Sequence, residues 1–282
     1  MRPLTQLLNE GITFDTIPCD TTGSIKLDAI ESLIRPNTVA IIVNHASNVC
    51  GTIQPIKEIG IICKDHHLHF IVDAAQTAGI IPIDVKESQI DALCFTGHKG
   101  LLGPQGIGGM ILTKEMAQAL TPLIAGGTGS FSHLETMPTN MPDAFESGTL
   151  NLPGIIGLNE GLTFIESKGM ENIHNHELAL TEAFLKGLRP IDGINIIGKQ
   201  DVQDRTAVVS ITIDGADAAS VAYELESTYH IMTRVGLHCA PRAHQTLGTY
   251  PEGTVRFSFG YANTMEDIET TLSALTTIAN KI

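Results

Sequence analysis

One lysine stands where an apolar, strand-like segment runs into a glycine-rich turn. The apolar segment covers residues 91–95, and the turn that follows it reads Thr96-Gly97-His98-Lys99-Gly100. Glycine lets a backbone bend sharply and approach a ligand closely, so the amine of Lys99 could be held against a bound molecule. An amine shielded from water loses its proton more easily and can act as a nucleophile or carry a proton. By itself the turn also fits a surface lysine, because lysine side chains are mostly exposed.

A carboxylate and a side-chain amide follow a second apolar segment upstream of this lysine. That segment ends in Ile71-Val72 and runs into Asp73-Ala74-Ala75-Gln76. In an α/β sheet, ligands bind beyond the carboxyl ends of the strands, and Asp73 and Thr96 both fall at such ends. Asp73 is therefore expected near Lys99. An aspartate at this place could equally cap a helix that begins near Ala74.

Two further segments carry a guanidinium and a thiol. Arg256 lies within the apolar residues 254–258, where it could hold a carboxylate through two parallel hydrogen bonds. Cys239 lies in Arg234-Val235-Gly236-Leu237-His238-Cys239-Ala240-Pro241. Thiolate is the attacking form of cysteine, and a neighbouring imidazole and arginine could favour it, although an inert buried cysteine is the alternative. For Arg234, a second cation at the site and a structural salt bridge both remain open.

A histidine cluster at residues 66–69 raises the question of a metal. His67 and His69 would share one face of an extended segment, and His66 precedes them. No cysteine or carboxylate completes a ligand set, and a helix end leading into a strand explains the cluster. We therefore expect no metal site.

The order of the predicted elements indicates an α/β fold. Strands are expected at residues 13–18, 38–43, 91–95 and 109–112 and in the run that ends at Asp73, with helices at 1–10, 26–34 and 56–65. The run at 38–43 is apolar throughout, which favours a strand buried on both faces of a mostly parallel sheet. After a long irregular stretch at 121–147, helices at 152–168 and 170–188 lead to a smaller α+β part with strands at 194–197, 208–213 and 254–258 and helices at 216–229 and from 265 onward. We predict a large domain at 1–160 and a small domain with its linking helices at 161–282.

Composition narrows the class of protein. The chain has 282 residues, 43% of them hydrophobic and 17% charged, which is typical of a globular protein. A formal charge of −14 argues against nucleic acid or an anionic membrane as partner. Five cysteines without a C-x-x-C pair favour free thiols in a reducing compartment, and no apolar run approaches the length of a membrane span. A cytoplasmic location is expected.

Three motifs together give the chain a family resemblance. Asp73-Ala74-Ala75-Gln76, Thr96-Gly97-His98-Lys99 and the segment from Arg234 to Cys239 resemble the aminotransferase class V and cysteine desulfurase family, whose members have fold type I and use pyridoxal 5′-phosphate (PLP). The resemblance implies that Lys99 attaches the cofactor covalently and that Asp73 keeps its ring nitrogen protonated. It further implies the following contacts: Gln76 with the ring hydroxyl, Thr96 and His98 with the phosphate, Thr149 with the phosphate of a neighbouring subunit, and Asn48, Arg256 and Arg234 with the amino-acid substrate. Capping of the following helix is an equal alternative for Thr149.

The thiol separates the activities found in this family. The segment around Cys239 resembles the sulfur-acceptor segment of the desulfurase subgroup that includes selenocysteine lyases, so the predicted activity is removal of sulfur from L-cysteine through an enzyme persulfide to give alanine. Cysteine or selenocysteine is the expected substrate, a homodimer the expected assembly, and a sulfur-acceptor protein a further partner. Another class V activity, such as a selenocysteine lyase, transaminase or epimerase, is the first alternative.

The start of the chain departs from the family pattern. The resemblance implies a glycine/threonine phosphate loop and a histidine that stacks on the cofactor ring, both upstream of the present Met1, and neither is found in this sequence. The chain is therefore expected to lack the N-terminal segment of its family. A catalytically impaired protein with the PLP fold is the second alternative.

Overall fold

Three of the four strands of the first sheet are parallel. The computed structural model describes residues 1–282, and this sheet has the order β1-β2-β3-β4. Its strands are β1 (Ala40–Asn44), β2 (His69–Asp73), β3 (Ala92–Thr96) and β4 (Gly108–Leu112), of which only β4 is antiparallel to its neighbour. Asn44 pairs with Asp73, and Asp73 with Cys94, so the carboxyl ends of three strands meet at one edge. The predicted α/β fold with a mostly parallel sheet is confirmed.

Helices cover one face of this sheet more than the other. The helical elements of this half are α1 (Arg2–Leu7), η1 (Leu8–Glu10), η2 (Leu27–Ala29), α2 (Ile30–Leu33), α3 (Ile56–Asp65) and α4 (Lys114–Ala119). α3 packs Ile59 and Cys63 into one core cluster with Phe70 and Val72 of β2. On the opposite face, Ile42 of β1 is 51% exposed. The prediction that residues 38–43 are buried on both faces is therefore wrong, because only alternate residues of β1 are buried.

The expected strand at residues 13–18 is also wrong. This segment joins no sheet, and only Cys19, just beyond it, forms an isolated bridge, with Ile25. A side chain from the far end of the sequence holds it instead. Arg242 donates from Nη1 to Thr16 Oγ1 at 2.7 Å, and its guanidinium lies 5.7 Å from the centroid of the Phe14 ring.

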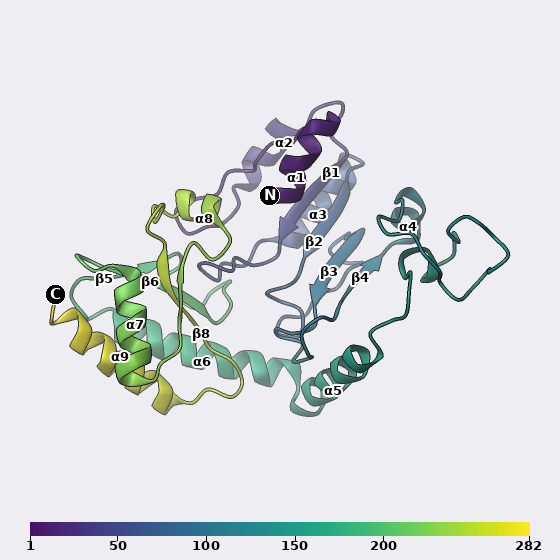
Figure 1. The fold of residues 1–282 in the computed structure, drawn as a ribbon. Helices are drawn as coiled ribbons and strands as arrows, with labels where there is room; N and C mark the ends of the chain where they lie inside the picture. Colours follow the sequence, from purple (N-terminus) through teal and green to yellow (C-terminus); the bar gives the residue numbers. More distant parts are fainter.

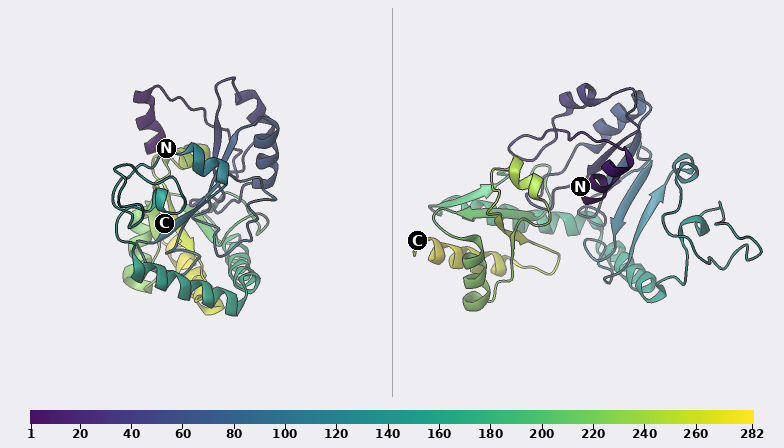
Figure 2. Two further views of the ribbon diagram at one scale, coloured as in Figure 1. Left: turned by 90° about the vertical axis from the view of Figure 1, so that its right-hand side faces the viewer. Right: turned by 45° about the horizontal axis from the view of Figure 1, so that its top comes forward.

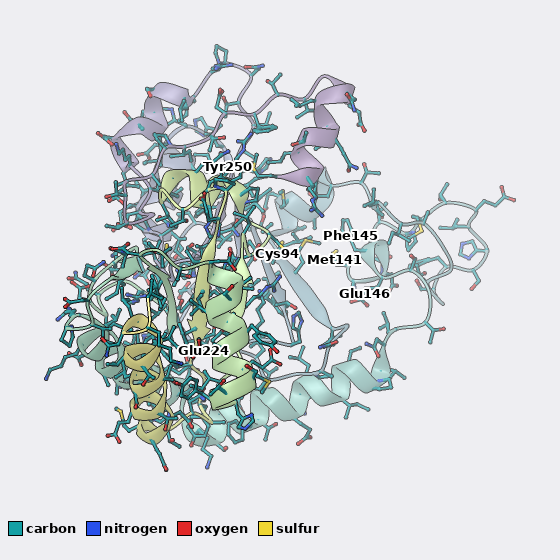
Figure 3. The ribbon with its side chains drawn as sticks, turned by 60° about the vertical axis from the view of Figure 1, so that its left-hand side comes forward. Cys94, Met141, Phe145, Glu146, Glu224 and Tyr250 are labelled. Atoms are coloured by element: carbon teal, nitrogen blue, oxygen red, sulfur yellow. The ribbon has the colours of Figure 1, made fainter.

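A long irregular segment and two long helices connect the halves. Residues 121–151 contain only one short turn of 3-10 helix, η3 (Asp143–Phe145), and form the wide loop beyond α4 (Figure 1; Met141, Phe145 and Glu146 are marked in Figure 3). α5 (Leu152–Lys168) and α6 (Met170–Leu188) then run from the first sheet to the second, as Figure 1 and the right-hand view of Figure 2 show. Asn151 caps α5 by accepting a hydrogen bond from Gly154 N–H. Gly169, at φ 81°, turns the chain from α5 into α6.

The second sheet is antiparallel and has its own core. Its order is β5-β6-β8-β7, with β5 (Ile194–Ile197), β6 (Val208–Ile213), β7 (Arg234–Gly236) and β8 (Thr254–Ser258). α7 (Ala218–Tyr229), α8 (Pro241–Thr246) and α9 (Met265–Ala279) complete this half. Its core joins Leu180 and Phe184 of α6 to Phe257 of β8 and Leu275 of α9. The smaller α+β part is thus confirmed, with two short elements, β7 and α8, that the sequence did not predict. None of the helices is both long and apolar enough to span a bilayer.

Candidate active site

Backbone contacts shape the turn that carries the lysine. Gly97 N–H donates to the carbonyl of Ile107 at 2.9 Å, which ties the end of β3 to the start of β4. A Cβ atom on Gly97 would lie 2.6 Å from Ile107 Cγ2, and one on Gly100 would lie 2.7 Å from the carbonyl oxygen of Ala78. Both contacts are too short for any side chain, so glycine is required at both positions. These two glycines fix Lys99 at the carboxyl end of β3.

The amine of Lys99 lies in a field of several charges. Its side chain touches solvent, yet the protein around it lowers the pKa of the amine, with desolvation as the largest cause. The carboxylate of Asp73 acts in the opposite direction, while the guanidinium groups of Arg256 and Arg234 lower the pKa further. Charges act this way only over short distances. Asp73, Arg256 and Arg234 are thus the charges that act on Lys99, and Arg234 pairs with Arg256 across β7 and β8.

One carboxylate oxygen of Asp73 accepts a hydrogen bond within the chain, and the other accepts none. Oδ1 accepts a hydrogen bond from Ala75 N–H at 2.8 Å, which caps the turn that follows β2. Oδ2 makes no hydrogen bond, and neither does the half-buried side chain of Gln76. The capping role and a free oxygen for a ligand are thus present in the same side chain.

A hydroxyl and an imidazole form a pair beside the lysine. Thr96 Oγ1 lies 2.7 Å from His98 Nδ1 at the end of β3. Thr149 lies on the exposed, irregular segment before α5 and makes no hydrogen bond within the chain. The capping alternative for Thr149 does not hold, because Asn151 caps α5.

The second sheet contributes a partly buried arginine with unused hydrogen-bonding capacity. Arg256 donates from Nη1 to the backbone oxygen of Asn48 at 2.9 Å, while its buried Nε has no partner. Burial lowers the pKa of Arg256, and the charge of Arg234 lowers it further. Neither arginine is paired with a carboxylate, so the structural salt bridge considered for Arg234 is not formed. A buried N–H without an acceptor is costly, and a bound carboxylate would satisfy it.

Cys239 is the exposed thiol of the chain and lies beside a cation. Arg234 Nη2 is 3.7 Å from Cys239 Sγ. The backbone at His238 and Cys239 is left-handed, with φ of 49° and 62°. Asn48 holds this turn by donating from Nδ2 to the carbonyl of His238 at 2.7 Å. In contrast, burial raises the pKa of the Cys63 thiol to about 12. The alternative of an inert buried cysteine at 239 does not match this exposure.

The sequence analysis did not identify His244 and Thr249, two buried residues behind the thiol of Cys239. His238 Nδ1 lies 3.4 Å from His244 Nε2, and His244 Nδ1 lies 2.7 Å from Thr249 Oγ1. His244 belongs to the short, polar helix α8, where nothing in the sequence distinguishes it from a solvated residue. The only available signal was a second histidine six positions after His238.

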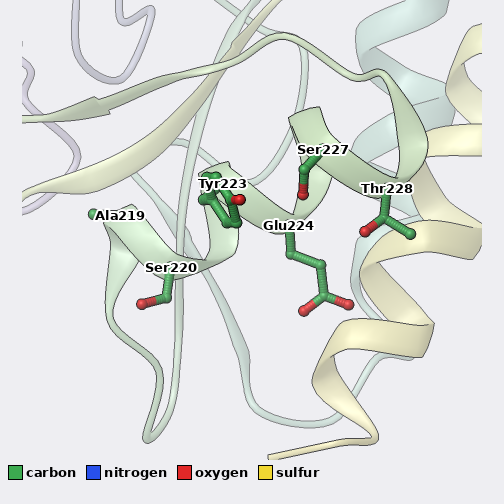
Figure 4. A pocket seen from close by; sticks show the side chains of 6 residues that line it. All are labelled: Ala219, Ser220, Tyr223, Glu224, Ser227 and Thr228. Atoms are coloured by element: carbon green, nitrogen blue, oxygen red, sulfur yellow. The ribbon is translucent and has the colours of Figure 1, made fainter.

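A shallow depression elsewhere does not belong to this group of residues. All of its lining residues come from α7 (Figure 4): Ala219, Ser220, Tyr223, Glu224, Ser227 and Thr228. Its one ionised group, Glu224, is paired with Lys281. None of the predicted site residues lies there.

The donor set near Lys99 fits pyridoxal phosphate. The set offers an amine with a lowered pKa, an open carboxylate oxygen on Asp73, and the hydroxyl and imidazole pair of Thr96 and His98. The unpartnered Nε of Arg256 completes the set with a group suited to a substrate carboxylate. The individual residue roles remain predictions.

Comparison with known proteins identifies the family. The family model described as aminotransferase class-V matches residues 2–271. A probable cysteine desulfurase of Methanothermobacter thermautotrophicus is 35% identical over 270 residues, which cover 95% of this chain and 67% of that protein. Another, from Pyrococcus abyssi, is 35% identical over 269 residues and is matched over 66% of its length. The apo structure of a cysteine desulfurase from Thermococcus onnurineus superposes with a TM-score of 0.91 at 32% identity, covering 100% of this chain and 70% of that one.

The chain thus spans about two thirds of the length of the curated relatives it matches. Aminotransferase class-V proteins and cysteine desulfurases depend on pyridoxal phosphate, in agreement with the cofactor expected from the motifs. Since the family model covers nearly all of the sequence, the chain belongs to the aminotransferase class-V family.

Proposed function

We propose that this chain is a cysteine desulfurase that uses pyridoxal phosphate to remove sulfur from L-cysteine and release alanine. The observation that carries the proposal is the exposed thiol of Cys239, which lies 3.7 Å from the guanidinium of Arg234. The charge of the same guanidinium contributes to the lowered pKa of Lys99. A transaminase needs no thiol there. The names of the relatives and their similarity over most of this chain support the same activity.

The cofactor would be held by the first sheet. When bound, pyridoxal phosphate supplies an electron sink for the bonds at the substrate's α-carbon. Lys99 would attach it and later carry the proton at that carbon, because a partly buried amine gives up its proton readily. The open oxygen of Asp73 would keep the ring nitrogen protonated. The remaining contacts follow the expectation from the sequence: Gln76 to the ring hydroxyl, and Thr96 and His98 to the phosphate.

The substrate would be oriented from the second sheet. Arg256 would bind the α-carboxylate of cysteine through its unpartnered Nε and a neighbouring N–H, and Asn48 and Arg234 flank it. Cys239 would then attack the substrate sulfur as thiolate. One S–S bond forms as the C–S bond of the substrate breaks, which leaves a persulfide on Cys239 and alanine after proton uptake. A sulfur-acceptor protein would collect the persulfide sulfur.

We further propose that two copies of the chain form a homodimer. Leu123, Ile124 and Ile156 are 98%, 71% and 64% exposed in the segment that also carries Thr149. Burial of these apolar side chains by a second copy would be favourable and would bring Thr149 toward the partner's phosphate site. Light scattering coupled to size-exclusion chromatography tests this, and a strictly monomeric protein would contradict it.

Domain division and location are proposals of the same kind. A large domain at 1–160 and a small domain at 161–282 are supported by the two separate sheets and their separate core clusters. A cytoplasmic location is supported by five free cysteines and no disulfide. Limited proteolysis at the junction of α5 and α6 around Gly169 tests the first, and thiol labelling in intact cells tests the second.

Two substitutions separate this activity from the alternatives. Purified protein is mixed with pyridoxal phosphate and L-cysteine under a reductant, and released sulfide is measured together with the visible absorption band of the bound cofactor. Cys239→Ala should abolish sulfide release and keep the band, whereas Lys99→Ala should erase the band. Unchanged turnover in Cys239→Ala would favour another class V activity, such as a selenocysteine lyase, transaminase or epimerase. No band in the unsubstituted chain would favour a catalytically impaired protein.

A further inference from the structure

Three buried side chains behind Cys239 form one continuous line of hydrogen bonds. His238, His244 and Thr249 are 4%, 0% and 7% exposed. Thr249 Oγ1 lies 2.7 Å from His244 Nδ1, and His244 Nε2 lies 3.4 Å from His238 Nδ1. The planes of the two imidazole rings are 20° from parallel and their centroids lie 5.6 Å apart, so the rings lie edge to edge along this contact. The line ends where His238 Nε2 lies 3.2 Å from the backbone oxygen of Arg234.

With neutral rings, one arrangement of hydrogens satisfies all three contacts of this line, and the backbone oxygen of Leu237 is a further acceptor for a ring N–H of His244. Burial lowers the pKa of His238 to about 4 and also lowers the pKa of His244, so both rings are uncharged near neutral pH. The backbone oxygen of Arg234 can only accept, so His238 Nε2 donates and His238 Nδ1 accepts. His244 Nε2 must therefore donate to His238, and His244 Nδ1 must accept from the hydroxyl of Thr249.

This line is attached to the turn that presents the thiol. His238 and Cys239 both have left-handed backbone, which costs energy for residues other than glycine and persists only where the surroundings hold it. The ring of His238 is held by His244 on one side and by the backbone of Arg234 on the other. Its backbone oxygen is held by Asn48. The strained turn is thus fixed from the ring and from the main chain at once.

We propose that Thr249 and His244 are positioning residues for the sulfur-accepting thiol, which keep the turn at Cys239 in its left-handed form beside Arg234 through the ring of His238. The proposal rests on the proposed function for the role of the thiol, but its geometry does not require the cofactor. Neither residue touches the substrate. The hydroxyl of Thr249 selects the tautomer of His244, and the tautomer of His244 decides whether His238 receives a hydrogen bond.

A matched pair of variants separates the hydroxyl from the packing of Thr249. Thr249→Val keeps the branched shape and removes the hydroxyl, whereas Thr249→Ser keeps the hydroxyl and removes a methyl group. If Thr249 served only to fill space, valine would be the milder change. If it acts through the hydrogen bond, serine is the milder change. His244→Gln, whose amide can donate to His238, and His244→Met, which cannot, give a second pair should Thr249→Val fail to fold.

The first measurement is the rate of alkylation of Cys239 by iodoacetamide in the full chain, followed by peptide mass spectrometry. Thr249→Val should slow the reaction about fivefold, the factor that corresponds to one net hydrogen bond, because the relaxed turn carries the thiolate away from Arg234. Thr249→Ser should stay near the rate of the unsubstituted chain, and so should His244→Gln. Equal rates in the valine and serine variants, or a slower serine variant, would overturn the proposal.

The second measurement is the tautomer of each ring from nitrogen-15 spectra of histidine-labelled protein. His238 and His244 should both carry their hydrogen on Nε2, and Thr249→Val should shift His244 toward a mixture while Thr249→Ser should not. An Nδ1–H tautomer of His244 in the unsubstituted chain would contradict the inferred line. Neither measurement needs turnover, so a chain that releases no sulfide would refute the proposed function and leave this test intact.

Discussion

Phe184 is one of the buried side chains through which α6 packs against the second sheet. It is fully buried, and its ring centroid lies 5.0 Å from that of Phe257 and 5.1 Å from that of Phe259. Phe257 follows Arg256 on β8. The aromatic contact therefore helps to determine where the guanidinium of Arg256 lies.

The free energy of unfolding should fall by more the more of the Phe184 side chain is removed. Phe184→Ala removes a whole buried ring and leaves a cavity, which lowers the free energy of unfolding by about 3–5 kcal/mol. Phe184→Leu keeps most of the apolar volume and loses the two aromatic contacts, each of which contributes about 0.5–1.5 kcal/mol. The expected cost of the leucine variant is therefore about 1–3 kcal/mol, smaller than that of the alanine variant.

Urea unfolding followed by circular dichroism measures these differences, since the chain contains no tryptophan for fluorescence. Tyr223→Ala is the matched control, because this ring is 74% exposed on α7 (Figure 4) and its loss should change stability by less than about 0.5 kcal/mol. A cost below about 1.5 kcal/mol for Phe184→Ala, with an unchanged urea dependence, would refute the reasoning. So would equal costs for the alanine and leucine variants.

Three further predictions concern the site and its supports. Burial lowers the pKa of His45 to about 4. The free energy of unfolding therefore has its full value above pH 6.5 and falls by about 3 kcal/mol as the pH drops to 4, because the unfolded chain binds the proton more readily. His45→Gln should flatten this part of the plot of unfolding free energy against pH, and an unchanged plot would contradict the prediction. Gly100→Ala should weaken cofactor binding, read from the absorption band, because the added Cβ would meet Ala78 O at 2.7 Å, whereas Gly127→Ala, with open space around it, should not. Arg256→Lys should raise the KM for cysteine at least about tenfold, since a lysine cannot make two parallel hydrogen bonds to a carboxylate; a KM within twofold of the original would remove the assigned role.

Helical periodicity and apolar runs in the sequence correctly predicted several helices and strands. α3, α5 and α6 begin and end at the residues predicted from the sequence, and β6 and β8 match their apolar runs. The strand ends at Asp73 and Thr96 followed from the parallel order of the sheet. In each case the deciding information lies within a few residues of the element.

Other features depend on contacts that a single sequence does not reveal. The run at residues 38–43 is apolar enough for burial on both faces, yet whether a second layer covers Ile42 is decided elsewhere in the molecule. The hydrogen bond from Asn48 to His238 joins residues 190 positions apart, and that from Arg256 to Asn48 joins residues 208 positions apart. The sequence motifs identified these residues as candidate site residues, but only the fold shows how they contact one another.

In the proposed substrate-binding part of the site, Arg256 is held through the backbone of Asn48 and not through the Asn48 side chain. Arg256 donates to the main-chain oxygen of Asn48, so this contact survives when the Asn48 side chain is removed. The loop that carries Asn48 is in turn bound to the second sheet, because Thr206 N–H donates to Gly51 O at 2.8 Å and Ser210 Oγ donates to Val49 O at 2.5 Å. Asn48 therefore keeps its place relative to β6 even though it follows a strand of the first sheet.

Buried Arg205 strengthens this attachment. It has no carboxylate partner, and its Nη2 donates to Cys50 O at 3.3 Å and to Val208 O at 2.7 Å, which bridges the loop and β6 with one guanidinium nitrogen. Asn48→Ala should therefore loosen only the turn at His238, whose carbonyl loses its donor, and should leave the position of Arg256 unchanged. A substrate-binding defect in Asn48→Ala would then report on the amide itself rather than on a displaced arginine.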